Sequence, residues 1–126
     1  EIGVRLVGSE MCIRDRNKIV KILDGKKGRD IEVLNISELT TMTDYFIIVT
    51  GGSDTQVKAL CDNVEEELEK EGLTPVNKEG YKTAQWILLA YDEVVVHIFL
   101  GETREFYGLE RVWKDGIRVD VSDLLV

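Results

Sequence analysis

The chain is poor in the residues from which catalytic, metal and disulfide sites are most often built. Its 126 residues include one histidine, one proline and two cysteines, Cys12 and Cys61. Two cysteines are too few for a disulfide framework or a four-ligand zinc site. No apolar run approaches the about 18–20 residues that span a bilayer, and the N-terminal apolar residues are scattered among charges, unlike a signal peptide. We therefore expect a cytoplasmic protein with no metal, no cofactor and no membrane contact.

Positive charge is also scarce, because 16 Lys and Arg stand against 24 Asp and Glu and leave a net charge of −8. Phosphate binding draws on clustered Lys and Arg, so we expect little direct nucleic-acid contact. The acidic balance favours a basic protein partner, since complementary fields steer association. The alternative is an acidic surface that only keeps the protein in solution.

Residues 1–16, EIGVRLVGSEMCIRDR, fit no pattern in the rest of the chain. We expect a non-native or disordered segment there, left by cloning or by a misassembled reading frame. The length and the hydrophobic share of 44% suit one domain with one core, predicted over residues 17–126.

Hydrophobic periodicity predicts that this domain is α/β. A first helix is expected over residues 17–27, ending at two glycines. Strands are predicted at residues 31–36, 45–50, 85–91 and 94–100, with weaker candidates at 74–78 and 117–121. Residues 45–50 are apolar on both faces and should lie centrally, and Asp92-Glu93 should be the turn of a hairpin. The expected fold is a mixed sheet of about five strands with two or three helices.

The longest helix is predicted to follow Gly51-Gly52-Ser53. Ser53 and Gln56 have the spacing of a capping box, in which each side chain satisfies a backbone donor of the first turn. The apolar stripe of this helix consists of Val57, Leu60, Cys61, Val64 and Leu68. Between positions 54 and 71 there are seven acidic residues and two lysines, which give the other face of this helix a net charge of −5. That face is either solvated or turned to a partner.

The segment 92–113, DEVVVHIFLGETREFYGLERVW, concentrates aromatic and charged side chains around the predicted central strand 94–100. Gly101 ends this strand, and Thr103 can cap a short helix. Phe106, Leu109 and Trp113 would share one face of that helix. The simpler interpretation is a strand and a helix that pack together, with His97 as a packed, hydrogen-bonded residue.

Two features raise the question of nucleotide chemistry. Gly51-Gly52-Ser53 lies at a strand-to-helix junction, where backbone amides often bind anions. It lacks the GxxxxGK[ST] pattern, and Asp54 adds a negative charge where a phosphate would lie. The layout also resembles a reduced nucleotidyltransferase-like fold, but residues 74–78, TPVNK, lack the paired carboxylates that hold metal ions there.

A hydrolytic site would need a nucleophile and an orienting carboxylate around His97. Cys61 is expected on the buried side of its helix, where thiols are usually inert. We therefore expect a non-enzyme.

Residues 94–99 (VVVHIF) and 102–113 (ETREFYGLERVW) resemble the closing signature of the ribosomal silencing factor family, also called Iojap-like proteins. Other matches occur in the family's order at 43–48 (TDYFII), 50–51 (TG), 56–59 (QVKA), 62–65 (DNVE), 79–81 (EGY) and 86–89 (WILL). The resemblance covers roughly residues 18–126, and it rests on the order and spacing of many short matches.

The resemblance implies a protein that binds the large ribosomal subunit through that subunit's fourteenth ribosomal protein. It would sterically block joining of the small subunit and repress translation under nutrient limitation. The positions that match the family pattern near the binding surface are Trp86, His97, Phe99, Arg104, Tyr107, Leu109 and Glu110. Three alternatives stay open: a large-subunit assembly factor, a nucleotide-binding enzyme of the nucleotidyltransferase type, and a homodimeric adaptor. For Trp86 the alternative role is sheet core.

Overall fold

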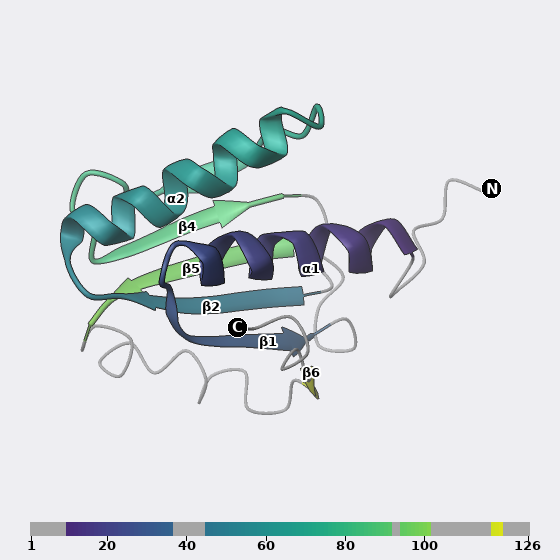
Figure 1. The fold of residues 1–126 in the computed structure, drawn as a ribbon, viewed down its shortest axis with the longest axis horizontal. Coiled ribbons are helices and arrows are strands. Elements are labelled where there is room, and N and C mark those ends of the chain that lie inside the picture. The colour runs from purple at the N-terminus through teal and green to yellow at the C-terminus, as the bar shows by residue number, and fades with distance from the viewer. Residues whose placement is uncertain (1–9, 37–44, 92–93, 102–116, 120–126) are drawn as a thin grey trace.

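The computed structural model describes residues 10–36, 45–91, 94–101 and 117–119, and it has the predicted α/β architecture (Figure 1). The elements, in chain order, are α1 Glu10–Gly25, β1 Arg29–Asn35, β2 Tyr45–Gly51, α2 Asp54–Glu69, β3 Asn77–Glu79, β4 Trp86–Ala90, β5 Val94–Leu100 and β6 Ile117–Val119. The described part is thus one mixed sheet of six strands with two helices, which confirms the predicted fold class.

The strands lie in the order β3-β4-β5-β2-β1-β6. β2 and β5 pair in parallel at the centre, and the other neighbours are antiparallel. Every residue of β2 is buried, as expected for a strand that is apolar on both faces. β4 and β5 form the predicted hairpin, in which the Tyr91 N–H donates to the Val94 carbonyl at 2.8 Å. The two weaker strand candidates became the short edges, β3 and β6.

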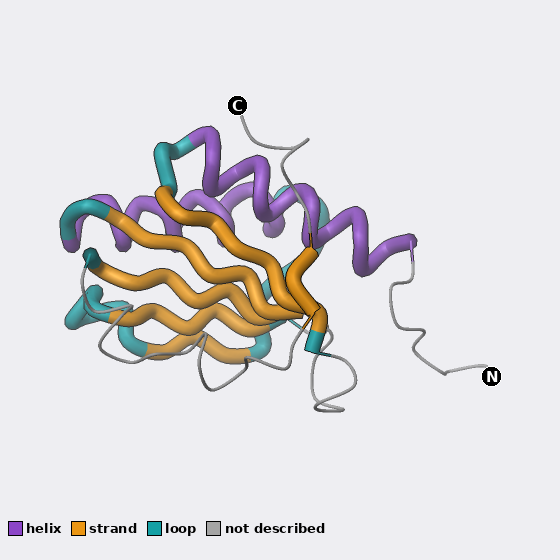
Figure 2. Tube along the Cα trace, turned by 90° about the horizontal axis from the view of Figure 1, so that it is seen from below, coloured by secondary structure: helices purple, strands orange, loops and turns teal. Residues whose placement is uncertain are grey.

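Both helices cover the same face of the sheet (Figures 1 and 2). Side chains alternate along each strand, so every second strand residue meets the helices. The larger core cluster lies here and includes Ile19, Val20 and Leu23 of α1, the five predicted stripe residues of α2, and Ile47, Val49, Ile87, Leu89, Val96 and Ile98 of the strands. The apolar stripe predicted for α2 is therefore confirmed as buried.

A second, smaller cluster lies on the opposite face, on which neither described helix packs (Figure 2). It consists of Leu34, Ile36, Phe46, Ile48 and Phe99, with Trp86 and Val95 packed against it. These residues alternate with the helix-facing ones along β1, β2, β4 and β5. We refer to this side as the helix-free face.

Two predicted starts were wrong. α1 begins at Glu10 and not at residue 17, and within the added part the Arg16 guanidinium lies 4.8 Å from the Tyr45 ring centre. β3 begins at Asn77 and not at residue 74, because the Pro75 nitrogen carries no hydrogen and cannot join the ladder. The predicted stop of α2 at Gly72 is confirmed, because the regular helix runs to Glu69, Gly72 has a φ of +82°, and the Leu73 N–H donates to the Leu68 carbonyl at 3.0 Å across this turn.

The helix predicted after Thr103 and the turn at residues 92–93 lie outside the described residues. None of the described helices is both long and apolar enough to cross a membrane.

Candidate partner-binding site

The structure brings together the three predicted site residues that it describes. Trp86 begins β4, and His97 and Phe99 lie on β5. Trp86 is directly opposite Phe99 in the antiparallel ladder, and all three side chains belong to the helix-free face. The other four predicted residues, Arg104, Tyr107, Leu109 and Glu110, lie outside the described residues. The partner-binding role of all seven stays a prediction.

Ring contacts and one hydrogen bond join these side chains to Phe46. The Trp86 and Phe99 rings stack with centroids 5.2 Å apart and planes inclined by 23°. The Phe46 ring meets His97 edge-on, with centroids 4.6 Å apart at 69°. The Trp86 Nε1–H donates to His97 Nδ1 at 3.1 Å. We call Phe46, Trp86, His97 and Phe99 the aromatic cluster.

Burial differs within the aromatic cluster. Phe99 is fully buried and His97 is 4% exposed, whereas Trp86 is partly exposed. Of the three predicted residues in the cluster, Trp86 is therefore the one that can touch a partner without rearrangement of the sheet. Aromatic side chains that are partly exposed and backed by packed rings are the kind enriched at interface cores.

Burial also decides the charge of His97. Desolvation lowers the pKa of this imidazole to about 3, so the ring is neutral at physiological pH. Nδ1 accepts the bond from Trp86, so the single ring proton lies on Nε2. Among the described residues, Nε2 has no hydrogen-bond partner.

The arrangement gives His97 no hydrolytic partners among the described residues. Cys61 lies on α2 within the core cluster of the helix-covered face, away from the aromatic cluster. Desolvation and the neighbouring Glu65 carboxylate raise the pKa of the Cys61 thiol to about 12, which keeps it protonated. The expectation of a buried, unreactive thiol agrees with this geometry.

Three backbone donors at the start of α2 bond to side chains of the same segment. Ser53 Oγ accepts from the Gln56 N–H at 3.1 Å, as the capping box predicts, and Gln56 Oε1 accepts from the Gly52 N–H at 2.6 Å. Asp54 Oδ1 accepts from the Thr55 N–H at 2.8 Å. The Gly52 amide of the Gly51-Gly52-Ser53 turn is thus engaged, and this argues against phosphate binding there.

One group of side chains has the composition of a metal site. Ligand atoms of Cys61, Asp62 and Glu65 lie within 4.8 Å of one another. However, Glu65 is paired with Lys78 at 2.7 Å, and the Asp62 carboxylate accepts from the Tyr81 hydroxyl at 3.0 Å. The Lys78 ammonium already neutralises one of these carboxylates, so we interpret the group as a structural tie between α2 and the β3 edge.

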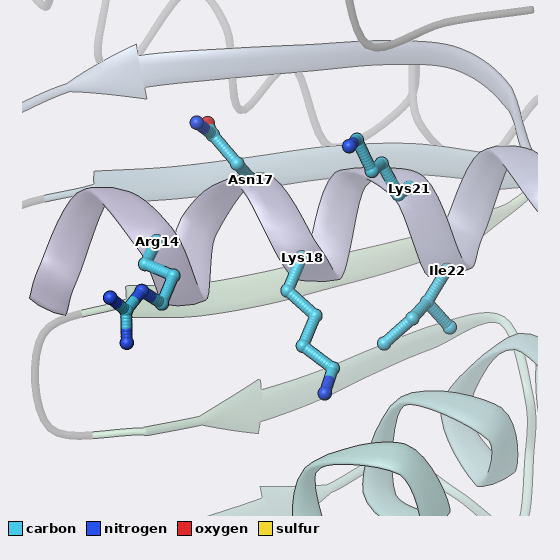
Figure 3. A pocket seen from close by; sticks show the side chains of 5 residues that line it. All are labelled: Arg14, Asn17, Lys18, Lys21 and Ile22. Atoms are coloured by element: carbon cyan, nitrogen blue, oxygen red, sulfur yellow. The ribbon is translucent and has the colours of Figure 1, made fainter.

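A groove of about 500 Å³ runs along α1 (Figure 3). Its described lining consists of Arg14, Asn17, Lys18, Lys21 and Ile22, all from α1. Lys18 forms an ion pair with Glu71, just beyond α2, so part of this positive charge is already neutralised. The groove is therefore a weaker candidate than the aromatic cluster.

Comparison with known proteins decides the family. A family model described as "Ribosomal silencing factor during starvation" matches residues 10–125. The chain belongs to the ribosomal silencing factor family. The resemblance expected from the short motifs is thereby confirmed, and the match begins inside the segment 1–16. The domain boundary at residue 17 stays a prediction.

Individual relatives agree with the family. The chain is 36% identical over 104 residues to the ribosomal silencing factor RsfS of Chromobacterium violaceum, covering 82% of this chain and 85% of the relative. A crystal structure of a protein from the same organism superposes with a TM-score of 0.79 at 34% identity and covers 82% of this chain and 86% of its own. A more distant relative is "Mitochondrial assembly of ribosomal large subunit protein 1" of Mus musculus, 30% identical over 79% of this chain and 45% of that protein.

The sequence did not identify Phe46 as part of the site. Its signal was present, because residues 45–50 are apolar on both faces and half of them must turn away from the helices. What placed Phe46 against His97 is the parallel register, in which Phe46 is opposite Val95 and Ile48 is opposite His97. Register between strands far apart in the chain cannot be derived from spacing.

Proposed function

We propose that this protein binds the large ribosomal subunit through its fourteenth ribosomal protein and sterically blocks joining of the small subunit. It would repress translation in the cytoplasm when nutrients are limiting. The observation that carries the proposal is the match of residues 10–125 to the silencing factor family. The mechanism needs no chemistry, because a folded domain bound at the joining face excludes a second large particle by its volume.

The described geometry supports a binding role. In the aromatic cluster the partly exposed Trp86 ring stacks on Phe99 with centroids 5.2 Å apart, and Phe99 belongs to β5 at the centre of the sheet. Such preorganised aromatic anchors carry much of the affinity of protein interfaces. The net charge of −8 suits a basic ribosomal protein as the partner.

The first test is sedimentation with purified ribosomal subunits. We expect the protein to travel with the large subunit and to lower the fraction of joined ribosomes. Trp86→Ala removes the described anchor, and a Tyr107→Ala, Arg104→Ala double variant removes two of the positions predicted from the family pattern. Both variants should lose binding while keeping a cooperative unfolding transition. For Trp86→Ala we expect the binding free energy to be less favourable than that of wild type by about 2 kcal/mol or more.

Tyr81→Ala is the matched control, because this aromatic residue packs against the core cluster of the helix-covered face. It should bind like wild type, within about twofold. If wild type binds neither subunit, the proposal is wrong. If Trp86→Ala binds as tightly as wild type, the aromatic cluster is not the contact surface.

A second candidate function is assembly of the large subunit, which the name of the mouse relative favours. Binding without any loss of subunit joining would support this role over silencing. The nucleotide-binding alternative finds little support at the start of α2, where the N–H groups of Gly52, Thr55 and Gln56 are engaged. Labelled nucleotide with magnesium tests it directly, and no binding at about millimolar concentration removes it.

A further inference from the structure

We propose that His97 is a positioning residue of the partner-binding site. Its Nδ1 accepts the Trp86 indole N–H and so holds the indole ring in the orientation in which it meets the partner. This inference rests on the proposed function and assigns His97 a role beneath the contact surface. His97 acts through Trp86, because its own ring is 4% exposed.

Three contacts with described residues restrain the Trp86 ring. The β4 backbone holds Cα through the ladder with β5, Phe99 supports one face at a ring inclination of 23°, and His97 holds the indole nitrogen at 3.1 Å. Stacking alone allows a ring to turn in its own plane, whereas a hydrogen bond at one edge does not. The bond to His97 therefore restricts the orientation that Phe99 leaves open.

His97 is itself held firmly. It lies on the central strand β5, and Phe46 from the neighbouring strand β2 packs edge-on against its ring at 4.6 Å. Burial favours the neutral ring, and only the neutral ring can accept at Nδ1. The acceptor is thus fixed in position and in protonation state before any partner arrives.

The arrangement also indicates which partner group Trp86 meets. The indole has one N–H, and it is used inside the protein, so recognition must use the carbon surface of the ring. Aliphatic side chains and the cationic heads of Lys and Arg bind such a surface. An acceptor-rich partner surface would gain little from this residue. A basic protein fits both the ring and the net charge of −8.

The experiment is a double-mutant cycle on affinity for the large subunit. Trp86→Phe keeps an aromatic ring and removes the N–H, and His97→Phe keeps a ring and removes the acceptor. We expect each single variant to weaken binding about three- to tenfold, and the double variant to be no weaker than the more affected single variant. Losses that multiply in the double variant would overturn the inference, as would wild-type affinity in His97→Phe.

A second readout uses the free protein and needs no ribosome. The indole N–H resonance of Trp86, identified by its loss in Trp86→Phe, should shift in His97→Phe. His97→Asn keeps an acceptor near the position of Nδ1, so it should shift the resonance less and retain more affinity. Val95→Ala is the packing control, because this side chain packs against the same cluster. It should leave the resonance unchanged.

The two readouts separate this inference from the proposed function. If wild type fails to bind the large subunit while the resonance behaves as expected, the proposed function fails and the positioning of Trp86 stands as a property of the fold. If wild type binds but His97→Phe leaves the resonance and the affinity unchanged, the function stands and the inference is wrong. If His97→Phe does not fold, the test uses His97→Asn. Loss of binding in this variant, which retains an acceptor, would contradict the inference.

Discussion

His97 illustrates how burial alone can decide the behaviour of a titratable residue. In the unfolded chain His97 has its usual pKa of 6.5, whereas burial lowers the pKa to about 3 in the folded protein. Between these values the unfolded state holds more protons, so the stability of the fold rises with pH. The contribution of His97 to stability is complete above its pKa in the unfolded chain. It is lost progressively as the pH falls toward the pKa of His97 in the folded protein.

We predict that the free energy of unfolding of wild type falls, between about pH 7 and pH 5, by about 2 kcal/mol more than that of His97→Phe. His97 is the single histidine of the chain, and most carboxyl groups titrate below this window. Urea denaturation at both pH values measures the difference. Val95→Ala should follow the wild-type slope, and parallel pH profiles for wild type and His97→Phe would refute the depressed pKa.

At the scale of elements, Gln56 links the two helices. Its Oε1 accepts from the Gly52 N–H, and its Nε2 donates to the carbonyl oxygens of Lys27 at 2.9 Å and Lys26 at 3.3 Å. One side chain therefore ties the start of α2 to the end of α1. The capping box predicted a bond from Gln56 back to the N-cap residue Ser53, but the donor is the Gly52 N–H, and the packing of the helices added the bonds to Lys26 and Lys27.

Gln56→Ala should lower the free energy of unfolding by about 1–2 kcal/mol, because it removes these bonds from a partly exposed site. Gln56→Glu is the matched control, since it keeps the acceptor for Gly52 and loses the donor to Lys26 and Lys27. Its stability should lie between those of wild type and Gln56→Ala. Identical urea midpoints for all three proteins would show that the link between the helices contributes nothing.

The turn between β3 and β4 depends on Gly80, and a comparison with Gly72 isolates the reason. Both have φ of +82°, but a Cβ added at Gly80 would collide with the Trp86 carbonyl oxygen, while one at Gly72 would meet nothing within 4 Å. Gly72→Ala should cost about 1 kcal/mol from backbone strain. Gly80→Ala should lower the free energy of unfolding by roughly 1–3 kcal/mol more than Gly72→Ala does, as measured by thermal or urea unfolding.

Gly80→Ala should also weaken large-subunit binding, because relief of the collision moves the backbone of Trp86. Gly72→Ala should bind normally. Equal losses of stability in the two variants would mean that the turn can shift without strain.

At the scale of the whole molecule, the net charge of −8 should act mainly on the rate of association. We predict that the association rate with the large subunit falls as salt rises from about 50 to about 200 mM, with a smaller effect on dissociation. Stopped-flow or surface-based kinetics would measure both rates. An association rate that does not depend on salt would contradict electrostatic steering.

The acidic face of α2 provides the control for this prediction. α2 lies across the sheet from the aromatic cluster, so we expect its exposed acids to be solvated and not to contact the partner. Glu66→Gln with Glu69→Gln should leave dissociation unchanged and reduce the salt dependence only slightly. A large rise in the dissociation rate would instead assign this face to the interface.

Much of the fold could be predicted because its signals are local. The stripe from Val57 to Leu68, the capping pair Ser53 and Gln56, and the doubly apolar run at β2 each indicate one element without reference to any other. Boundaries were less predictable. α1 extends back to Glu10, and Arg16 in this extension contacts Tyr45, a residue 29 positions away.

Within the candidate site, residue types were predictable and roles were not. Family motifs in the sequence pointed to Trp86, His97 and Phe99, but strand pairing decided which of them is partly exposed and which lie beneath. The β4–β5 register sets Trp86 over Phe99, and the parallel β2–β5 register brings Phe46 to His97. Periodicity and capping act within about one helical turn, so the chain alone specifies elements, composition and family. Contacts between distant strands arise only when the sheet closes, and they determine the burial, tautomer and orientation on which recognition depends.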